Sequence, residues 1–359
     1  MQGDCKPVCD LHTRDAPAGV RGSNMRHAEM VRDLWRHREL GNAARDYVSL
    51  VRYATLAASS HNTQPWKFRL EPGRIVILPD LSRRCPQVDP DDHHLYASLG
   101  CAAENLLLAA QAAGLEGHLA YDAADAALRI DLDPTVPCRS ARFDAIPRRQ
   151  CSRAEYDGTA IPAEQLRQLE QIARGNGVSV SLLTDRQQKE QVAEYVAAGN
   201  CAQFSDPGWA REMRHWIRFN ARDAKRTADG LYGPVLGIPR VPRRLGELLM
   251  PLAASAQRQN QKDASQIRSS AAIAVFFSEV DDQQHWVEAG RCYERFALEA
   301  AAAGLCTAFI NQPVEVPSVR AQFASFLGIG QRRPDLVVRI GRGPSMPRSL
   351  RRPVEQVLA

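Results

Sequence analysis

No apolar run in the sequence is long enough to cross a lipid bilayer. The longest such runs, 270–278 and 300–310, have about ten residues, whereas a spanning helix needs about 20. Residues 1–15 carry charges early and hold no apolar core, so no secretory signal is visible. From these absences we expect a cytoplasmic protein with no membrane-spanning segment and no membrane partner.

Several short motifs of well-known catalytic and nucleotide sites are also missing. The sequence has no G-x-G-x-x-G after a strand-like segment, no G-x-x-x-x-G-K-[ST], no H-E-x-x-H and no G-x-S-x-G. These absences argue against a Rossmann dinucleotide fold, a P-loop, a helical zinc-protease site and a hydrolase nucleophile elbow.

The nine cysteines include no C-x-x-C pair and are scattered along the chain, as is typical of reduced, buried thiols. Cys5, Cys9 and His12 could be read as a loose metal cluster, but they have no fourth ligand nearby. We therefore do not favour a metal site there.

The charge balance gives little reason to expect a nucleic-acid partner. The 46 basic and 41 acidic side chains leave a formal charge of +5, which is small and dispersed. With 44% hydrophobic and 24% charged residues, the composition is that of a globular protein, and 359 residues suggest two domains.

An internal repeat supports a two-domain chain. Residues 91–115 align without gaps to 281–305, at an offset of 190, with ten of the 25 aligned positions identical. The shared Asp-Asp start, inner glycine and Gly-Leu end favour a duplicated domain over two unrelated alanine-rich helices. Two similar domains in one chain can pack about a pseudo-two-fold axis, as the subunits of a homodimer do.

The repeat also bears on residues 91–94, which read Asp-Asp-His-His and resemble a metal-binding cluster. In the second copy the two histidines are replaced by Gln283-Gln284. We therefore favour a helix start, where acidic side chains stabilise the positive end of the helix dipole, and we expect no metal site.

We expect a frayed tail at 1–24, a first domain at 25–140 and a second domain at 141–359. Within the second domain, 206–266 is rich in Arg, Pro and Gly and predicts a long excursion with one or two helices. The hydrophobic pattern predicts helices within 26–57 and at 95–115, 162–174, 186–199 and 285–304, and strands at 67–70, 74–78, 128–132, 179–184, 270–278 and 336–340.

The most informative stretch is SSHNTQPW, at 59–66. It concentrates hydroxyl, imidazole and amide groups in eight residues and ends in Pro-Trp. Such a loop suits the binding of a planar heterocycle with a polar edge. A turn capped by serine and asparagine is an equally good interpretation.

Two arginine-containing stretches could bind phosphate. Arg149 and Arg153 would share one face of a helix start, beside free backbone N–H groups; a solvated helix start is the alternative. The glycine-containing C-terminal stretch could also contact phosphate oxygens. A basic tail for acidic partners is its alternative, weakened by interleaved prolines and the absence of aromatic residues. The arginines of that stretch are Arg339, Arg342, Arg348, Arg351 and Arg352.

The segment YATLAASSHNTQPWKF (53–68) resembles the loop of the nitroreductase superfamily, whose members bind FMN. A longer similarity, over roughly 45–357, is to the Acg-like branch, in which two domains are fused in one chain. It rests on 53–68, 95–115, the R-x-x-S-R segment 149–153 with Tyr156-Asp157, 206–220, 229–239 and 334–357.

This resemblance implies an α+β nitroreductase-like fold, with two related domains whose antiparallel-rich sheets are flanked by helices, and a lid-like insertion. It implies one FMN site shared by the two domains, because the first domain lacks its own R-x-x-S-R segment. The residues it implies are Ser59, Ser60, Asn62 and Gln64 at the isoalloxazine edge; Arg149, Ser152 and Arg153 at the phosphate, ribityl chain and pyrimidine edge; Arg348, Arg351 and Arg352 at the phosphate; and Ile310, Asn311 and Gln312 near the central ring.

The resemblance further implies an oxidoreductase that takes hydride from NAD(P)H at flavin N5 and reduces a nitroaromatic, a quinone or a related small acceptor. The flavin carries out the chemistry, so no catalytic side chain is expected. The alternative is a flavin-sequestering, stress-related protein with little turnover, in which a lid at 206–266 excludes nicotinamide. A monomeric pseudo-dimer is expected rather than an obligate homodimer.

Overall fold

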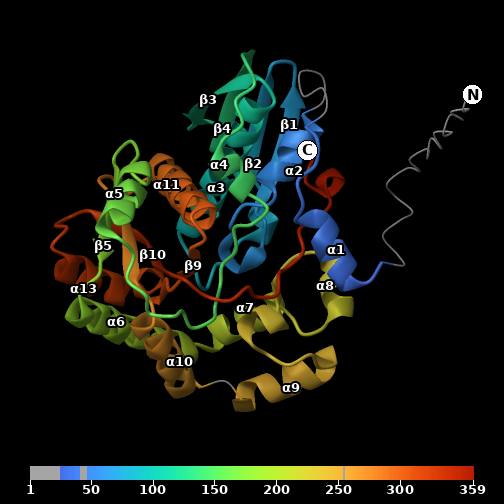
Figure 1. The fold of residues 1–359 in the computed structure, drawn as a ribbon. Coiled ribbons are helices and arrows are strands. Elements are labelled where there is room, and N and C mark those ends of the chain that lie inside the picture. Colours follow the sequence, from blue (N-terminus) through green and yellow to red (C-terminus); the bar gives the residue numbers. More distant parts are fainter. Residues whose placement is uncertain (1–24, 41–46, 254) are drawn as a thin grey trace, which may run out of the picture.

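The computed structural model describes residues 25–40, 47–253 and 255–359, which form helices and antiparallel sheets (Figure 1). The predicted α+β class is thereby confirmed. The expected tail at 1–24, which includes Cys5, Cys9 and His12, lies outside the described residues. Within the described ranges, no helix combines the length and the apolar character needed to cross a membrane.

The first sheet has the strand order β1-β2-β4-β3, and all neighbouring strands are antiparallel. Strands β1 (Trp66–Glu71) and β2 (Arg74–Pro79) form a hairpin with a short Pro-Gly link. Helix α3 (His93–Ala112) follows, and it leads to β3 (Leu115–Asp122) and β4 (Ala127–Pro134). The upper part of Figure 1 shows this sheet.

The second sheet has the order β5-β8-β10-β9 and is also antiparallel. After β5 (Val178–Leu183) and β8 (Ala272–Ser278), helix α11 (Gln283–Ala302) leads to β9 (Cys306–Phe309) and β10 (Arg333–Gly341).

The two sheets therefore share one topology. In each, the strands lie in the chain order first, second, fourth, third, and one long helix follows the second strand. This common layout supports the duplication inferred from the repeat. The expected boundary near residue 140 falls between the two sheets, although the division into domains stays a prediction.

The repeat helices α3 and α11 cross with their backbones in contact. A Cβ atom on Gly100 would lie 1.9 Å from the carbonyl oxygen of Val287, and one on Gly290 would lie 1.9 Å from that of Ala97. Gly100 and Gly290 are the inner glycines matched at the offset of 190. Glycine is required at both positions, because no side chain fits between the helices.

Buried ion pairs accompany this crossing. Glu104 of α3 lies 3.2 Å from Nε of Arg291 and 3.0 Å from Nη1 of Arg295, both on α11. Glu294, which occupies the matching position of α11, lies 2.9 Å from Nε of Arg149. A buried carboxylate needs such a partner, since desolvation otherwise disfavours its charge.

The excursion is inserted between the first two strands of the second sheet, where the first sheet has only the Pro-Gly link. It is more helical than the one or two helices expected, because its prolines lie near helix starts, between helices or, for Pro251, near the end of α9. Its described elements are α7 (Pro207–Trp216), β6 (Ile217–Arg218), α8 (Ala221–Thr227), β7 (Leu231–Tyr232), α9 (Arg243–Ala253) and α10 (Ala256–Arg268), along the bottom of Figure 1.

The remaining elements complete the two layers. Strand β3 was not predicted, because its alternating Leu, Glu, His and Tyr residues follow the alanine-rich helix directly. The described parts of the periodic segment 26–57 contain two short helices, as the pattern predicted. The other helices are α1 (His27–Leu34), α2 (Val48–Ala54), α4 (Ala141–Ala145), α5 (Ala163–Ile172), α6 (Arg186–Ser205), α12 (Gln312–Glu315) and α13 (Pro317–Leu327).

Replacing the glycines at the crossing should destabilise the protein. Alanine normally favours a helix over glycine by about 1 kcal/mol, but at Gly100 or Gly290 the methyl group would collide with a backbone carbonyl of the other helix. We expect Gly100→Ala and Gly290→Ala each to lower the free energy of unfolding by about 2 kcal/mol or more, measured by urea denaturation. As the control, Gly233→Ala adds a Cβ with no contact below 3.6 Å and should be nearly neutral; equal losses in all three variants would contradict the prediction.

Candidate functional site

A cavity of about 790 Å³ lies where the loop after α2, helix α3, the second sheet and the excursion meet. Ser59, Ser60 and His61 of the first half line it, together with Arg153 and the end of β9 from the second half. Its volume is within the range of about 300–1,000 Å³ typical of small-molecule sites. The cavity can therefore hold one ligand of cofactor size.

The excursion covers this cavity with apolar side chains. Trp209 and Met213 of α7 contribute, as do Phe219, Leu231 and Met250 from the segments that follow. Apolar walls of this kind bury the faces of a flat ligand and exclude water.

The loop 59–66 reaches the cavity through an unusual backbone. His61, Asn62 and Gln64 have φ values of 47°, 55° and 55°, in the left-handed region that non-glycine residues seldom adopt. The Oγ of Ser59 accepts a hydrogen bond from the backbone N of Gln64 at 3.1 Å. Such a backbone is costly and persists only where its surroundings fix it.

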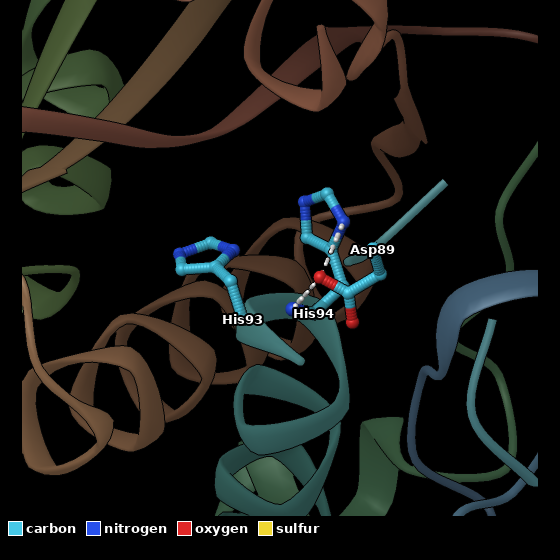
Figure 2. A group of neighbouring side chains, drawn as sticks. All are labelled: Asp89, His93 and His94. Atoms are coloured by element: carbon cyan, nitrogen blue, oxygen red, sulfur yellow. Dashed lines mark hydrogen bonds and ion pairs between the residues drawn. The ribbon is translucent and has the colours of Figure 1, made fainter. Parts of the chain in front are cut away.

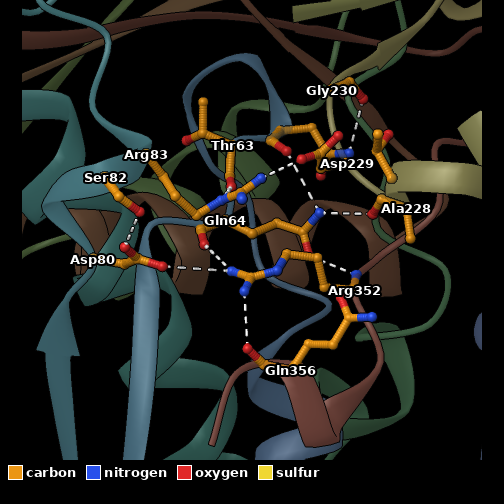
Figure 3. Close-up of polar contacts among 12 residues, drawn as sticks. Thr63, Gln64, Asp80, Ser82, Arg83, Ala228, Asp229, Gly230, Arg352 and Gln356 are labelled. Carbon is orange, nitrogen blue, oxygen red and sulfur yellow. Dashed lines mark hydrogen bonds and ion pairs between the residues drawn. The ribbon is translucent and has the colours of Figure 1, made fainter. Parts of the chain in front are cut away.

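Those surroundings are the excursion. Asn62 Nδ2 donates to the carbonyl oxygen of Gly230 at 2.9 Å, and the backbone N of Gly230 donates to the carbonyl oxygen of Asn62 at 3.1 Å. Gln64 Nε2 donates to the carbonyl oxygen of Ala228 at 2.9 Å, and its Oε1 accepts from the backbone N of Arg352 at 2.8 Å (Figure 3). The loop amides thus hold 228–230 in place.

An ionic contact strengthens the same junction (Figure 3). Asp229 pairs with Arg83 and with Nη2 of Arg218, the latter at 2.6 Å. Burial alone would raise the pKa of Asp229, but the arginines outweigh it and lower that pKa below its usual value. The carboxylate therefore stays charged.

Four of the predicted arginines bind protein groups instead of facing the cavity. The side chain of Arg149 is 3% exposed and pairs with Glu294; burial lowers its pKa, but Glu294 more than offsets this and raises it. Arg348 and Arg351 lie over the ring of Trp35, and burial lowers the pKa of both. Arg348 donates to the carbonyl oxygens of Pro147, Arg148 and Arg149. Arg351 donates to those of Thr55, Leu56, Ala57 and Leu350. Arg352 donates to those of Gln64 and Gln356 and lies 3.7 Å from Asp80.

Arg153 differs from these arginines. It is half-buried, lines the cavity, and its guanidinium has no hydrogen-bond or ion-pair partner within the described part of the chain. Lys262 lines the same cavity, and its Nζ donates to the carbonyl oxygen of Leu236 at 3.0 Å. Burial lowers the pKa of Lys262. An unpaired guanidinium beside an ammonium group is suited to an anionic group of a ligand.

The turn after β9 also reaches the cavity. The backbone N of Ile310 donates to the carbonyl oxygen of Val337, and Asn311 Oδ1 accepts from the backbone N of Val337 at 2.9 Å. The next side chain, Gln312, donates through Nε2 to Asp263, but its buried Oε1 has no partner in the described structure. An unsatisfied buried acceptor is uncommon and suits a ligand donor.

His61 lines the cavity but was not among the predicted site residues. Its Nδ1 lies 3.7 Å from Sγ of Cys85, and burial lowers its pKa to about 4, with Arg153 adding to the effect. Its position within SSHNTQPW could have identified it as a site residue. The resemblance implied only the hydroxyl and amide side chains of that loop.

Of the 13 predicted residues, the cavity is lined by Ser59, Ser60, Arg153, Ile310, Asn311 and Gln312. The other seven do not line it, because their side chains bond to the excursion, to backbone carbonyls or to buried acids. For Ser152 that partner is the carbonyl oxygen of Pro344, at 3.4 Å. These seven are Asn62, Gln64, Arg149, Ser152, Arg348, Arg351 and Arg352.

No family model matches the chain. Among curated proteins, "Putative NAD(P)H nitroreductase Rv3131" of Mycobacterium tuberculosis is 27% identical over 327 residues, covering 86% of this chain and 90% of that protein. "Putative NAD(P)H nitroreductase acg" of the same organism is 22% identical over 332 residues, covering 86% and 94%. "Probable NAD(P)H nitroreductase PigM" of Serratia is 25% identical over 211 residues, covering 52% and 56%.

Solved structures give weaker similarities. A nitroreductase with bound FMN from Bacteroides fragilis has 14% identity and a TM-score of 0.37, covering 59% of this chain and 95% of that one. The FMN-dependent nitroreductase NfnB from Mycobacterium smegmatis, in complex with NADPH, has 13% identity and a TM-score of 0.36, covering 58% and 94%.

The low pKa of His61 should make the protein less stable in acid. A histidine with a folded-state pKa of about 4 and an unfolded value near 6.5 binds its proton more readily in the unfolded state. Stability is therefore lost as the pH falls from about 6.5 to about 4. His61→Asn, which tolerates positive φ, should remove about 1–3 kcal/mol of this loss.

Urea unfolding at pH 7 and pH 4.5 would measure this difference. His118→Asn is the control, because the His118 side chain is 59% exposed. An acid loss that is the same in wild type and His61→Asn would show that His61 is not responsible.

Proposed function

This chain belongs to the nitroreductase superfamily, in its Acg-like branch, and from that premise we propose an NAD(P)H-dependent oxidoreductase that binds FMN in the cavity of about 790 Å³. The observation that carries the proposal is the unpaired guanidinium of Arg153 in a cavity shared by both halves of the chain. The proposed acceptor is a nitroaromatic, a quinone or a related small molecule.

The residues around the cavity fit FMN, which combines a flat ring, a polar ring edge and a phosphate. Apolar side chains of the excursion suit the ring faces. The unsatisfied Oε1 of Gln312 and the hydroxyls of Ser59 and Ser60 suit the polar edge. Arg153, with Lys262 beside the same cavity, suits the phosphate.

When bound, FMN would supply hydride transfer at N5. The protein's part would be to orient the ring and to balance charge. Arg153 would offset negative charge on the ligand, and His61, neutral near pH 7, would add a hydrogen-bonding group without a charge. The apolar side chains of the excursion would keep water from the ring.

We propose an indirect role for the seven predicted residues that lie behind the cavity wall. Asn62 and Gln64 fix the covering segment, and Arg149 fixes α11 through Glu294. Arg351 and Arg352 bind backbone carbonyls of Ala57 and Gln64 and so hold the C-terminal stretch against the loop after α2, whereas Arg348 holds it against 147–149. Ser152 joins the neighbouring C-terminal stretch through Pro344.

Removing the cavity guanidinium should weaken FMN binding. A charge-assisted hydrogen bond to phosphate contributes roughly 1.5–3 kcal/mol, so Arg153→Ala should raise the FMN Kd about tenfold or more, measured by quenching of flavin fluorescence. Arg153→Lys should recover part of the affinity. Arg268→Ala, which removes an exposed partner of Glu190, is the control; an unchanged Kd in Arg153→Ala would place the phosphate elsewhere.

A second candidate function, flavin sequestration with little turnover, is favoured by the tight junction at 228–230. A cover held by several hydrogen bonds and ion pairs could exclude nicotinamide. The two functions predict different behaviour when NADPH is mixed with the FMN-loaded protein in the absence of oxygen. Rapid loss of the oxidised flavin absorption supports turnover, whereas persistent absorption supports sequestration.

Loosening the junction should speed that reaction. In Asp229→Asn, the ion pairs with Arg83 and Arg218 are lost, so the cover should open more often and flavin reduction by NADPH should accelerate several-fold. Asp131→Asn, which breaks the more exposed pair with Arg74, is the matched control. Equal rates in wild type and Asp229→Asn would mean that 228–230 does not limit access.

A further inference from the structure

A buried cluster of metal-ligating side chains lies at the start of α3, outside the residues proposed to contact FMN (Figure 2). Asp89, His93 and His94 are 3%, 2% and 6% exposed. Each offers one ligand atom, and these atoms lie within 4.8 Å of one another. Donor atoms of a tetrahedral Zn²⁺ site lie about 3.4 Å apart, so the side chains would have to close by up to about 1.4 Å around the ion.

His94 gives the clearest indication of a missing partner. Within the described ranges neither ring nitrogen has a hydrogen-bond partner of good geometry, although the ring is buried and the backbone of Asp335 lies near enough to favour its protonated form. The nearest charged atom, Oδ1 of Asp89, lies 3.9 Å from Nδ1. Buried imidazole nitrogens are normally bonded to protein, water or metal, and two unsatisfied nitrogens point to a ligand.

His93 is held as metal-binding histidines usually are. Its Nε2 lies 2.8 Å from Oδ1 of Asp335, and Oδ2 of Asp335 accepts from Oγ of Ser278 at 2.6 Å. The tautomer that donates from Nε2 leaves the lone pair of Nδ1 free. A carboxylate behind the imidazole is the common second partner of a zinc-bound histidine.

The cluster also has space and a possible fourth ligand. A second cavity of about 240 Å³ is lined by Asp89, His93, His94 and Glu315, among others, and it adjoins the cavity of about 790 Å³, which His94 and Glu315 also line. Glu315 is bonded to Gln203 through Oε2 at 2.6 Å, which leaves Oε1 available. The oxygens of Asp89 accept from the backbone N of His94 and of Leu95, both at 2.9 Å, and each keeps a further lone pair.

The capping role expected for 91–94 does not account for the two histidines. At the matching start of α11, Asp282 caps the helix through the backbone N of His285, at 2.9 Å, with Gln283 and Gln284 in the histidine positions. The ring of His285 also lies beside Asp282, with Nδ1 2.7 Å from Oδ1, but the positions matched to His93 and His94 hold glutamines. The histidines of α3 call for another function.

We propose that Asp89, His93 and His94 form a Zn²⁺ site, with Glu315 or water as the fourth ligand. Two imidazoles and a carboxylate, with one position left open, are a typical donor set for zinc. Asp335 is the positioning residue that orients His93. Because Asp335 belongs to β10 and Glu315 to α12, a bound ion would tie α3 to elements of the second sheet.

Zinc binding by the purified full-length protein tests the proposal. After removal of metal with a chelator, wild type should bind one equivalent of Zn²⁺ in competition with a chromogenic chelator, and its Tm should rise. His94→Gln and His93→Gln, which introduce the α11 residues, should each weaken zinc affinity about 100-fold or more, and Asp335→Asn about 10- to 100-fold. Co²⁺ would report the ligand set through its absorption spectrum, which should change in His93→Gln.

His118→Gln is the control, because it removes an exposed histidine that lies beside an acid, Asp133. A wild type that binds no zinc, or a His118→Gln variant that loses zinc as strongly as His94→Gln, would overturn the proposal. If His94→Gln fails to fold, His93→Gln and Asp335→Asn supply the same readout. The measurement uses no flavin, so its outcome does not depend on the proposed FMN site.

Discussion

The structure depends on the backbone contact between α3 and α11. Gly100 and Gly290 let each helix approach a carbonyl of the other, and this approach brings Glu104 close to Arg291 and Arg295. A wider crossing would separate these pairs and leave charges in a dry interior, which is costly. It would also move the loop after α2 away from the end of β9, and the cavity between them would lose one of its walls.

The second constraint is the loop 59–66, whose polar groups serve two purposes. The serines and His61 face the cavity, whereas Asn62 and Gln64 turn away and bond to 228–230. The left-handed backbone of His61, Asn62 and Gln64 makes this division possible, since neighbouring side chains then point in different directions. One short loop therefore forms part of the site and also fixes the segment that covers it.

The sequence predicted the architecture better than the contacts. The repeat was visible partly because Gly100 and Gly290 are matched at an offset of 190. Both positions require glycine, because a Cβ atom would collide with the other helix. The partners of the arginines could not be predicted, because a guanidinium can donate either to a phosphate or to a carbonyl oxygen. Only the fold shows that Arg348 and Arg351 donate to carbonyl oxygens. His61 and the orphaned Oε1 of Gln312 were likewise invisible, because burial and unsatisfied bonding are properties of three-dimensional packing.

The shared strand order of the two sheets has an evolutionary consequence. In a homodimer with two-fold symmetry, any substitution appears in both subunits, so a change that is favourable in one subunit must also be tolerated at the same position of the other. In this chain the two halves are encoded separately, so a substitution in one half leaves the other unchanged. One hairpin could acquire a long insertion while the other kept a Pro-Gly link, and one helix could begin with two histidines while its counterpart begins with two glutamines. A duplication of the kind inferred from the repeat therefore leaves the two halves free to specialise.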